Sequence, residues 1–198
     1  MHRGGEQVPV YILAGGRSSR FGSDKARALV HGRSLILHVA EALAPRASSL
    51  TVVADVEDKY DDLGLRTIAD RAPRLGPLAG LEAALLDGDE AGWLLLCSCD
   101  WVGLRPEWVD LLLHAREEGA SRAVAFKGPV WEPLLALYHR SLGAEVASRL
   151  AEGRLAPWRL LEDISARALS LPPDWEQARQ VNRPDDLVRA GGLDPGRR

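Results

Sequence analysis

The sequence predicts an α/β fold in which a doubly wound, mostly parallel sheet lies between two layers of helices, in a single domain spanning residues 1–190. Three observations lead to this class. Apolar, β-branched runs alternate with helical patterns along the chain. The run over residues 92–99 is apolar at successive positions, as in a parallel strand covered on both faces. No internal repeat or linker interrupts the pattern, and residues 191–198 are predicted to form a flexible tail.

The predicted elements follow one another in a regular order. Strands are predicted over residues 8–13, 50–54, 92–99, 121–126 and 133–138, with a short late strand at 168–171. Helices are predicted over residues 34–44, 78–86, 106–118, 142–151, 158–164 and 184–189. Pro45 stops the first helix, and Pro106 suits the first turn of the third. This alternation of strands and helices favours parallel pairing of neighbouring strands.

Composition limits the classes of partner. Of 198 residues, 46% are hydrophobic and 27% are charged, and the formal net charge is -3. This balance gives no general reason to expect nucleic acid or an anionic membrane as a partner. No apolar run approaches the roughly 18–20 residues that span a bilayer, and the first residues lack the apolar core of a signal peptide. We therefore expect a cytoplasmic protein that binds neither nucleic acid nor membrane.

The two cysteines of the chain, Cys97 and Cys99, lie two residues apart in an apolar run. In a strand they point to the same side, where they cannot easily form a disulfide with each other. Two thiols also do not make a zinc site without further ligands. They are predicted to be buried, inert thiols.

A glycine-rich segment, LAGGRSSRFGSDKA over residues 13–26, directly follows the first predicted strand. Open α/β sheets bind ligands at the carboxyl ends of their strands. Gly15 and Gly16 allow the backbone to approach a ligand closely, and their N–H groups suit phosphate oxygens. Three cations lie on the same segment: Arg17, Arg20 and Lys25. The segment predicts a phosphate-binding loop, and a solvated glycine-rich turn is the alternative.

Two common phosphate loops do not fit this segment. The dinucleotide fingerprint G-x-G-x-x-G has no register among Gly15, Gly16 and Gly22. The Walker A pattern requires lysine after its last glycine, whereas Ser23 follows Gly22, and the spacing from Gly16 is one residue too long. The sequence therefore disfavours a hydride-transfer enzyme and a P-loop NTPase.

The pattern L-A-G-G-x-S-x-R-x-G-x-D-K resembles the signature loop of the molybdenum cofactor guanylyltransferase family. Its fixed positions are all present: Leu13, Ala14, Gly15, Gly16, Ser18, Arg20, Gly22, Asp24 and Lys25. The looser pattern L-A-G-G-x-x-x-R-x-G is shared by nucleotidyltransferases that act on sugar phosphates and other phosphorylated acceptors. The loop thus indicates a nucleotidyltransferase first and the guanylyltransferase family second.

Four later segments extend the resemblance from Val10 to about Val188. They are the second nucleotide loop at residues 70–81, the strand ending in a metal-binding aspartate at 94–100, the x-P-L-x-A-L-Y strand at 131–138 and the N-x-P-[ED]-[ED]-L motif at 181–187. The resemblance implies a Rossmann-like, GT-A-like nucleotidyltransferase fold. It also implies transfer of GMP from GTP to the terminal phosphate of Mo-molybdopterin, which gives the guanine dinucleotide cofactor and pyrophosphate.

The resemblance also implies roles for particular residues. Arg20, Lys25 and Asp100 are expected to be catalytic, and Asp100 to hold Mg²⁺ as the cofactor. The nucleotide and acceptor are expected to contact Leu13, Ala14, Gly15, Gly16, Lys25, Asp70, Gly76, Pro77, Leu78, Gly80, Asp100 and Asn182. A phosphate nucleophile is already ionised at neutral pH, so the mechanism requires positioning and charge stabilisation rather than a general base.

Each of these roles has a structural alternative. Arg20 and Lys25 could be solvated surface cations, and Asp70 could simply form a turn. Asp100, at the end of an apolar strand, requires either backbone donors or a cation as its partner. Asn182 could contact the acceptor pterin or cap the last helix. Asp24, by contrast, is expected to order the loop by accepting a backbone N–H bond or pairing with a nearby cation.

The chain departs from the family pattern after the metal-binding aspartate. The family continues C-D-M-P-[FY], whereas this sequence has Cys99-Asp100-Trp101-Val102-Gly103, close to the expected acceptor site. Asp55 stands at or near a position where the family often has asparagine, and it is assigned no role.

Two other readings of the function remain at this stage. One keeps the class and changes the substrate, to a molybdopterin cytidylyltransferase or a transferase for another phosphorylated acceptor. The other is a nucleotide-binding regulatory protein without turnover, which would have no need of a metal-binding carboxylate. The partners expected from the favoured reading are GTP, Mo-molybdopterin and other molybdenum cofactor proteins.

Overall fold

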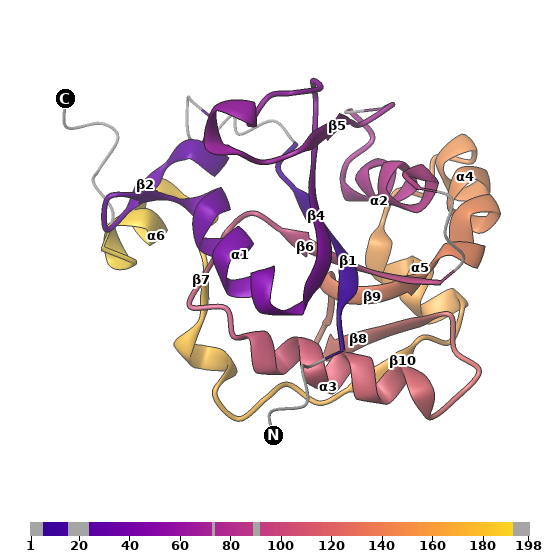
Figure 1. Ribbon diagram of the computed structural model, residues 1–198. Helices are drawn as coiled ribbons and strands as arrows, with labels where there is room; N and C mark the ends of the chain where they lie inside the picture. The colour runs from indigo at the N-terminus through magenta and orange to yellow at the C-terminus, as the bar shows by residue number, and fades with distance from the viewer. Residues whose placement is uncertain (1–5, 16–23, 73, 89–91, 192–198) are drawn as a thin grey trace.

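The computed structural model of the protein describes residues 6–15, 24–72, 74–88 and 92–191 (Figure 1). A seven-stranded sheet lies at the centre, in the order β10-β8-β9-β6-β1-β4-β5. Its strands are β1 (Val8–Leu13), β4 (Ala47–Ala54), β5 (Thr67–Ala69), β6 (Trp93–Ser98), β8 (Ala123–Lys127), β9 (Trp131–His139) and β10 (Arg167–Leu169). β9 runs antiparallel to both of its neighbours, β6 and β8, and the other described pairs in this sheet are parallel. The predicted class, an α/β fold with a mostly parallel sheet, is confirmed.

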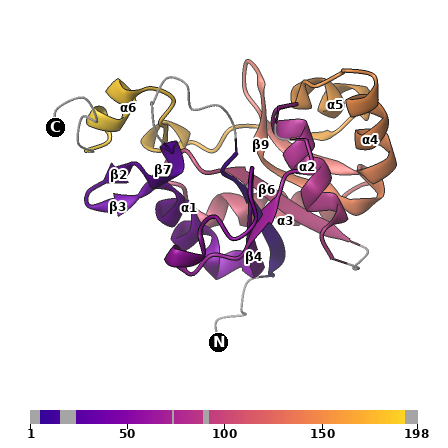
Figure 2. The same cartoon turned by 90° about the horizontal axis from the view of Figure 1, so that it is seen from above.

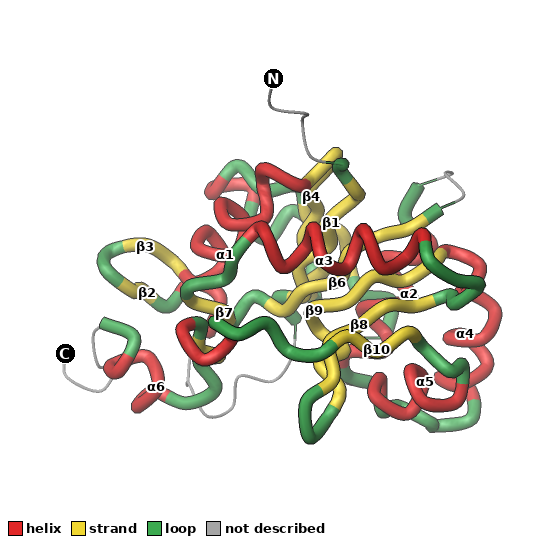
Figure 3. The backbone as a smooth tube through the Cα atoms, turned by 90° about the horizontal axis from the view of Figure 1, so that it is seen from below, coloured by secondary structure: helices red, strands yellow, loops and turns green. Residues whose placement is uncertain are grey.

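Helices cover both faces of the sheet. One face carries α1 (Leu35–Leu43) and α3 (Pro106–Glu117), and Figure 3 shows α3 lying in front of the sheet. The other face carries α2 (Pro77–Leu86), α4 (Gly143–Ala151) and α5 (Pro157–Asp163). The alternation of side chains along β1 follows these layers. Val10 and Ile12 face the core under α1 and α3, whereas Tyr11 and Leu13 face α2.

The order of the strands contains a reversal. From β1 the chain passes to β4 and β5 on one side, and then crosses back to β6 on the other side of β1. The carboxyl ends of β1 and β6 therefore meet at a topological switch point, the place where open α/β sheets bind ligands. The glycine-rich segment follows β1, and Asp100 follows β6.

Two short pairings attach the remaining elements. β2 (Leu29–Val30) pairs with β3 (Arg33–Ser34), and β7 (Trp101–Val102) pairs with β11 (Arg179–Gln180). The second pairing ties the C-terminal segment, which ends in α6 (Pro184–Arg189), to the residues after Asp100. Figure 2 shows α6 beside the β2–β3 hairpin, where Leu187 is buried together with Val30.

Most predicted elements are present, with shifted ends. The three-residue strand β5 and the two-residue strands β2, β3, β7 and β11 were not predicted, because so few residues carry no periodic signal. Cys97 and Cys99 are buried free thiols, as predicted, and burial raises the pKa of Cys99 to about 12. The predicted tail, apart from Gly191, lies outside the described residues. Within the described ranges, no helix combines the length and apolar character needed to cross a bilayer.

Candidate active site

Lys25 and Asp100 meet at the switch point. Lys25 begins the short 3-10 helix Lys25–Arg27, which follows the glycine-rich segment, and Asp100 lies two residues after the end of β6. Lys25 Nζ donates a hydrogen bond to Asp100 Oδ2 at 2.9 Å across 75 positions of sequence. The two side chains are only 16% and 15% exposed, so each charge would be poorly solvated without the other.

The carboxylate of Asp100 is also held from a second side. Ser98 Oγ donates to Asp100 Oδ1 at 2.6 Å, as expected for two residues that share a face. The backbone carbonyl of Asp100 accepts a hydrogen bond from Val181 N–H at 2.8 Å. Of the two partners left open for this carboxylate, backbone donors or a cation, the structure places a cation, Lys25, beside it.

Asn182 places its side-chain oxygen near the Lys25 ammonium as well. Its Oδ1 lies 3.4 Å from Lys25 Nζ, although 157 positions separate the two residues. The first turn of α6 is capped by Asp186, whose carboxylate accepts from the N–H groups of Asn182 and Arg183 at 3.0 and 2.8 Å. The side chain of Asn182 is therefore directed to the Lys25 ammonium, and the helix cap comes from another residue.

The end of β1 is fixed between its neighbouring strands. Leu13 C=O accepts from Cys99 N–H at 3.0 Å, and Ala14 N–H donates to Val53 C=O at 2.9 Å. A Cβ on Gly15 would make only ordinary contacts of 3.7 Å or more with Ala54. Among the described residues, packing therefore does not require glycine at position 15.

The second predicted nucleotide loop follows β5. Asp70 N–H donates to Ala54 C=O at 2.6 Å, and Asp70 Oδ1 accepts from Ala72 N–H at 2.8 Å. The aspartate therefore forms a turn, which was the structural alternative for it. Burial raises the pKa of Asp70, although the hydrogen bond from Ala72 opposes this shift.

Gly76 and Gly80 serve different purposes in the helix that follows. Gly76 caps α2 with φ +78°, a conformation that favours glycine, and Pro77 occupies the first turn. A Cβ on Gly80 would lie 2.7 Å from Leu13 Cδ2, so glycine here lets α2 pack closely against β1. Leu78 is fully buried, so it would offer a nucleotide its backbone rather than its side chain.

Several predicted residues of the first loop lie outside the described part of the chain. They are Gly16, Arg17, Ser18, Arg20 and Gly22. The roles expected for Gly16 and Arg20 therefore remain predictions. Asp24, at the end of the same loop, is described, and its Oδ1 accepts from Ala26 N–H at 3.0 Å. It also lies 3.5 Å from Lys59 Nζ, so both contacts expected of an ordering residue are present.

A second carboxyl group near Asp100 was not singled out from the sequence. Glu132, at the start of β9, is partly buried, and its pKa is raised first by burial and then by the negative charge of Asp100. In the sequence, residues 131–138 were recognisable only by their family pattern, which assigns no role to Glu132. The available signal was an acidic residue directly before the strand predicted to begin at Pro133.

The departure after Asp100 has a packing explanation. Trp101 is 3% exposed, and its ring centroid lies 5.1 Å from that of Trp175 in an edge-on arrangement. Trp175 also stacks on Trp108 of α3 at 4.9 Å. Trp101 therefore belongs to the core under α3. The unusual tryptophan at this position is therefore accounted for by packing in the core.

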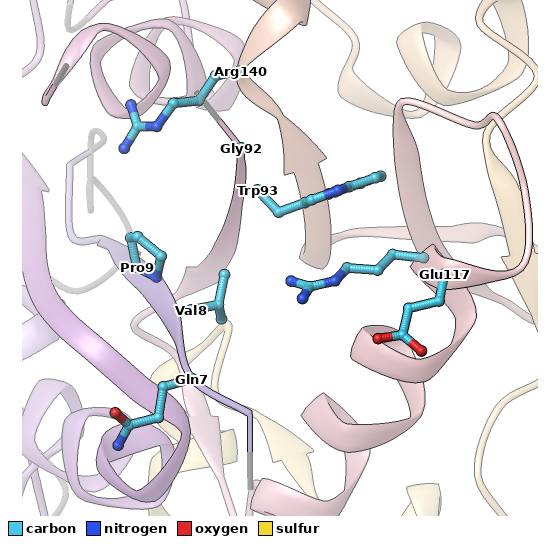
Figure 4. Close-up of a pocket in the computed structure, with 8 residues that line it drawn as sticks. Gln7, Val8, Pro9, Gly92, Trp93, Glu117 and Arg140 are labelled. Atoms are coloured by element: carbon cyan, nitrogen blue, oxygen red, sulfur yellow. The ribbon is translucent and has the colours of Figure 1, made fainter. Parts of the chain in front are cut away.

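Two cavities elsewhere on the molecule help to place the site. One of about 420 Å³, shown in Figure 4, lies at the opposite edge of the sheet and is lined by Gln7, Val8, Pro9, Gly92, Trp93, Arg116, Glu117 and Arg140. The other, of about 400 Å³, lies between the β8–β9 turn and α5 and is lined by Lys127, Pro129, Val130, Trp131, Pro133, Trp158 and Glu162. Neither includes a predicted site residue, so the site is identified by its side chains and its place at the switch point.

A doubly wound sheet with a glycine-rich loop, a lysine and an aspartate at its switch point defines a class, that of the nucleotide-binding α/β proteins. Comparison with known proteins makes this more specific. The MobA-like NTP transferase domain matches residues 10–168. The probable molybdenum cofactor guanylyltransferase of Deinococcus radiodurans is 39% identical over 184 residues, which cover 91% of this chain and 92% of that protein. The molybdenum cofactor guanylyltransferase of Photobacterium profundum is 33% identical, with coverage of 94% and 96%.

Solved structures agree with this result. The molybdopterin-guanine dinucleotide biosynthesis protein A of Archaeoglobus fulgidus superposes with a TM-score of 0.78 at 26% identity, covering 93% of this chain and 97% of that one. A CMP:2-keto-3-deoxy-manno-octonic acid synthetase complexed with CTP, at 16% identity and a TM-score of 0.72, shares the fold alone. The chain belongs to the molybdenum cofactor guanylyltransferase family and is a nucleotidyltransferase.

Proposed function

We propose that this protein transfers GMP from GTP to the terminal phosphate of Mo-molybdopterin, with Mg²⁺ as cofactor. The observation that carries the proposal is the contact between Lys25 Nζ and Asp100 Oδ2 at the switch point. Asn182 Oδ1 lies 3.4 Å from the same ammonium. The family relationship supplies the reaction, and this contact supplies the groups that can carry it out. A cation and a carboxylate held together at a nucleotide loop suit phosphate chemistry better than they suit a solvated surface.

Asp100 is the residue that would hold Mg²⁺. The donor set fits this ion, because a positive ammonium already lies between a carboxylate oxygen and an amide oxygen. Within the described residues, no group of three or more His, Cys, Asp or Glu side chains could hold a metal. Magnesium is commonly held by one or two carboxylates together with phosphate oxygens and water, and a single aspartate at a nucleotide loop fits this pattern. When bound, Mg²⁺ would neutralise negative charge on the nucleotide phosphates.

The residues of the chain would then act by position and charge. The acceptor phosphate forms a bond to the α-phosphorus of GTP, and the bond from that phosphorus to the pyrophosphate oxygen breaks. The Lys25 ammonium would neutralise the triphosphate of bound GTP, which contributes to the affinity for GTP, and would stabilise the negative charge that develops on the leaving pyrophosphate. The same role is proposed for Arg20, on the basis of its motif alone.

GTP is proposed as the donor nucleotide, and the alternatives differ in base or acceptor. The backbone between Gly76 and Gly80 would contact the base, since Leu78 is buried in the core. A cytidylyltransferase for the same pterin, or a transferase for another phosphorylated acceptor, would use the same Lys25 and Asp100. We also propose a cytoplasmic location and contacts with other molybdenum cofactor proteins, on the sequence grounds given above.

Calorimetry with GTP, CTP and ATP, each with and without Mg²⁺, tests the donor. Magnesium-dependent binding of GTP alone supports the proposal, and preference for CTP moves the protein to the cytidylyl branch. Release of pyrophosphate from GTP on addition of Mo-molybdopterin tests the reaction. Nucleotide binding without pyrophosphate release would point to a regulatory protein or a different acceptor.

A further inference from the structure

A buried tyrosine hydroxyl lies beside both ends of the nucleotide loop. Tyr60, in the segment after β4, is 0% exposed. Its hydroxyl donates to Asp24, with 2.9 Å to Oδ2 and 3.2 Å to Oδ1, and lies 3.4 Å from the carbonyl oxygen of Ala14. Ala14 comes just before the glycine pair, and Asp24 directly precedes Lys25. One hydroxyl thus contacts residues that precede and follow this loop in the sequence.

The orientation of the Asp24 carboxylate fixes the start of the short helix that carries Lys25. Asp24 is the N-cap of the 3-10 helix Lys25–Arg27, and its Oδ1 accepts from Ala26 N–H at 3.0 Å. A carboxylate that rotated away would release this N–H bond and loosen the first turn of the helix. The Tyr60 hydroxyl opposes that rotation because it binds the same carboxylate from the core side.

Tyr60 is itself firmly placed. Its backbone N–H donates to Thr67 Oγ1 at 3.3 Å, and its ring packs in the core under α1 and α3. The Arg27 guanidinium lies 5.1 Å from the ring centroid and makes hydrogen bonds of 2.7 Å to both oxygens of Asp62 and to Lys59 C=O. These contacts dock the segment 59–62 onto the turn that carries Lys25.

The hydroxyl is not explained by core packing. A buried phenol needs a hydrogen-bond partner, and phenylalanine would fill the same space without this requirement. Within the described residues, the hydroxyl has its hydrogen-bond contacts with Asp24 and Ala14, which flank the loop in the sequence. Burial and the Asp24 charge raise the pKa of Tyr60, so the group remains a protonated donor.

We propose that Tyr60 is a positioning residue of the nucleotide site. It fixes the Asp24 carboxylate, and through it the helical turn that directs Lys25 toward Asp100. Tyr60 acts through Asp24 and needs no contact with substrate. The part of this proposal that concerns GTP rests on the proposed function, whereas the part that concerns Asp24 does not.

The variant Tyr60→Phe tests both parts, because it keeps the ring and removes the hydroxyl. Tyr11→Phe is a matched control, since the Tyr11 hydroxyl also donates to an aspartate, Asp87, at 3.0 Å but at the far end of α2. In the protein without nucleotide, Tyr60→Phe should speed hydrogen exchange of the Ala26 amide by about fivefold or more. Tyr11→Phe should leave that amide unchanged.

The second readout is the affinity for GTP with Mg²⁺. Tyr60→Phe should raise the Kd and the KM for GTP by about tenfold while kcat at saturating GTP falls less than about threefold. A merely structural role would not separate KM from kcat in this way. The effect of Tyr60→Phe on the Kd should also shrink to within about twofold when Asp24 is already alanine, as a double-mutant cycle would reveal.

Each outcome decides part of the proposal. Unchanged exchange at Ala26 overturns the proposed hold on Asp24. Faster exchange with an unchanged Kd for GTP overturns the positioning role, and so does an equal change in Tyr11→Phe. If the wild-type protein binds no GTP, the proposed function fails, and the exchange measurement alone still decides whether Tyr60 holds Asp24.

Discussion

The parallel strands of the sheet begin at one edge, called here the amino edge, and end at the opposite one, the carboxyl edge. Similar charged side chains have different roles at these two edges. At the amino edge, Arg66 binds both oxygens of Asp87 at 2.7 and 2.8 Å, and Arg140 Nη1 donates to the carbonyls of Ala84 and Leu85 at 3.1 and 2.9 Å. Asp87 follows the last residue of α2, so these cations lie on the negative end of a helix. Figure 4 shows Arg140 at this edge.

At the carboxyl edge, Lys25 lies between oxygens of Asp100 and Asn182. Three segments far apart in the sequence converge there, and these contacts of Lys25 are not with the carbonyl end of a helix. The amino-edge contacts complete a helix terminus, whereas the carboxyl-edge contacts bring a cation and a carboxylate to a loop that follows β1. Charge at a sheet edge therefore indicates chemistry only when its partners do not already serve the fold.

Asp100→Asn should have the largest effect on activity. The substitution keeps the shape of the side chain and its hydrogen bond with Ser98, but it removes the charge that would hold Mg²⁺ and faces Lys25. We expect kcat to fall by about 10³-fold or more, while the free energy of unfolding falls by only about 1–2 kcal/mol because the partly buried Lys25 loses its charged partner. Steady-state pyrophosphate release and urea unfolding measure the two quantities. Parallel loss of folding and activity would mean that Asp100 serves the fold, as Asp87 does.

Lys25→Ala should come next. Loss of the ammonium removes charge stabilisation at the leaving pyrophosphate, and we expect kcat/KM for GTP to fall by about 10²-fold. Asp100 keeps its hydrogen bond from Ser98, so the fold should tolerate the change. The same assay and unfolding experiment apply, and wild-type turnover in Lys25→Ala would remove this residue from the reaction.

At the carboxyl edge, individual site residues could be predicted from the sequence, but their contacts with one another could not. Lys25 and Asp100 were predicted from the family resemblance, and the position of the glycine-rich segment and of Asp100 after predicted strands supported this. The approach of Asn182 depends on the two-residue β7–β11 pairing, which has no periodic signal. Tyr60 lies in a polar loop without a motif, and its contact with Asp24 spans 36 positions. Long-range contacts of single side chains depend on the finished fold.

At the amino edge, a substitution should lower stability and leave activity nearly unchanged, whereas at the carboxyl edge it should mainly lower activity. Asp87→Ala leaves Arg66 and the Tyr11 hydroxyl without their shared carboxylate. We expect the free energy of unfolding to fall by about 1–3 kcal/mol, while kcat changes less than about threefold. Urea unfolding and the pyrophosphate assay check this, with Asp100→Asn as the reciprocal control. A large loss of kcat at unchanged stability would contradict the assignment of this edge to the fold.

The smallest effect should be the dependence of stability on pH at this same edge. The hydrogen bond from Arg66, followed by that from Tyr11, lowers the pKa of Asp87 in the folded protein below its ordinary value of 3.8. The unfolded chain therefore binds a proton at higher pH than the folded chain does, so this contribution is present above pH 3.8 and is lost as the pH falls through the folded pKa. Asp87→Asn cannot titrate, so its stability should lose less than that of the wild type when urea unfolding is compared at neutral pH and below pH 3.8. Equal losses in both proteins would show that Arg66 does not favour the charged form of Asp87, and the distinction between the two edges would then have to rest on kinetics alone.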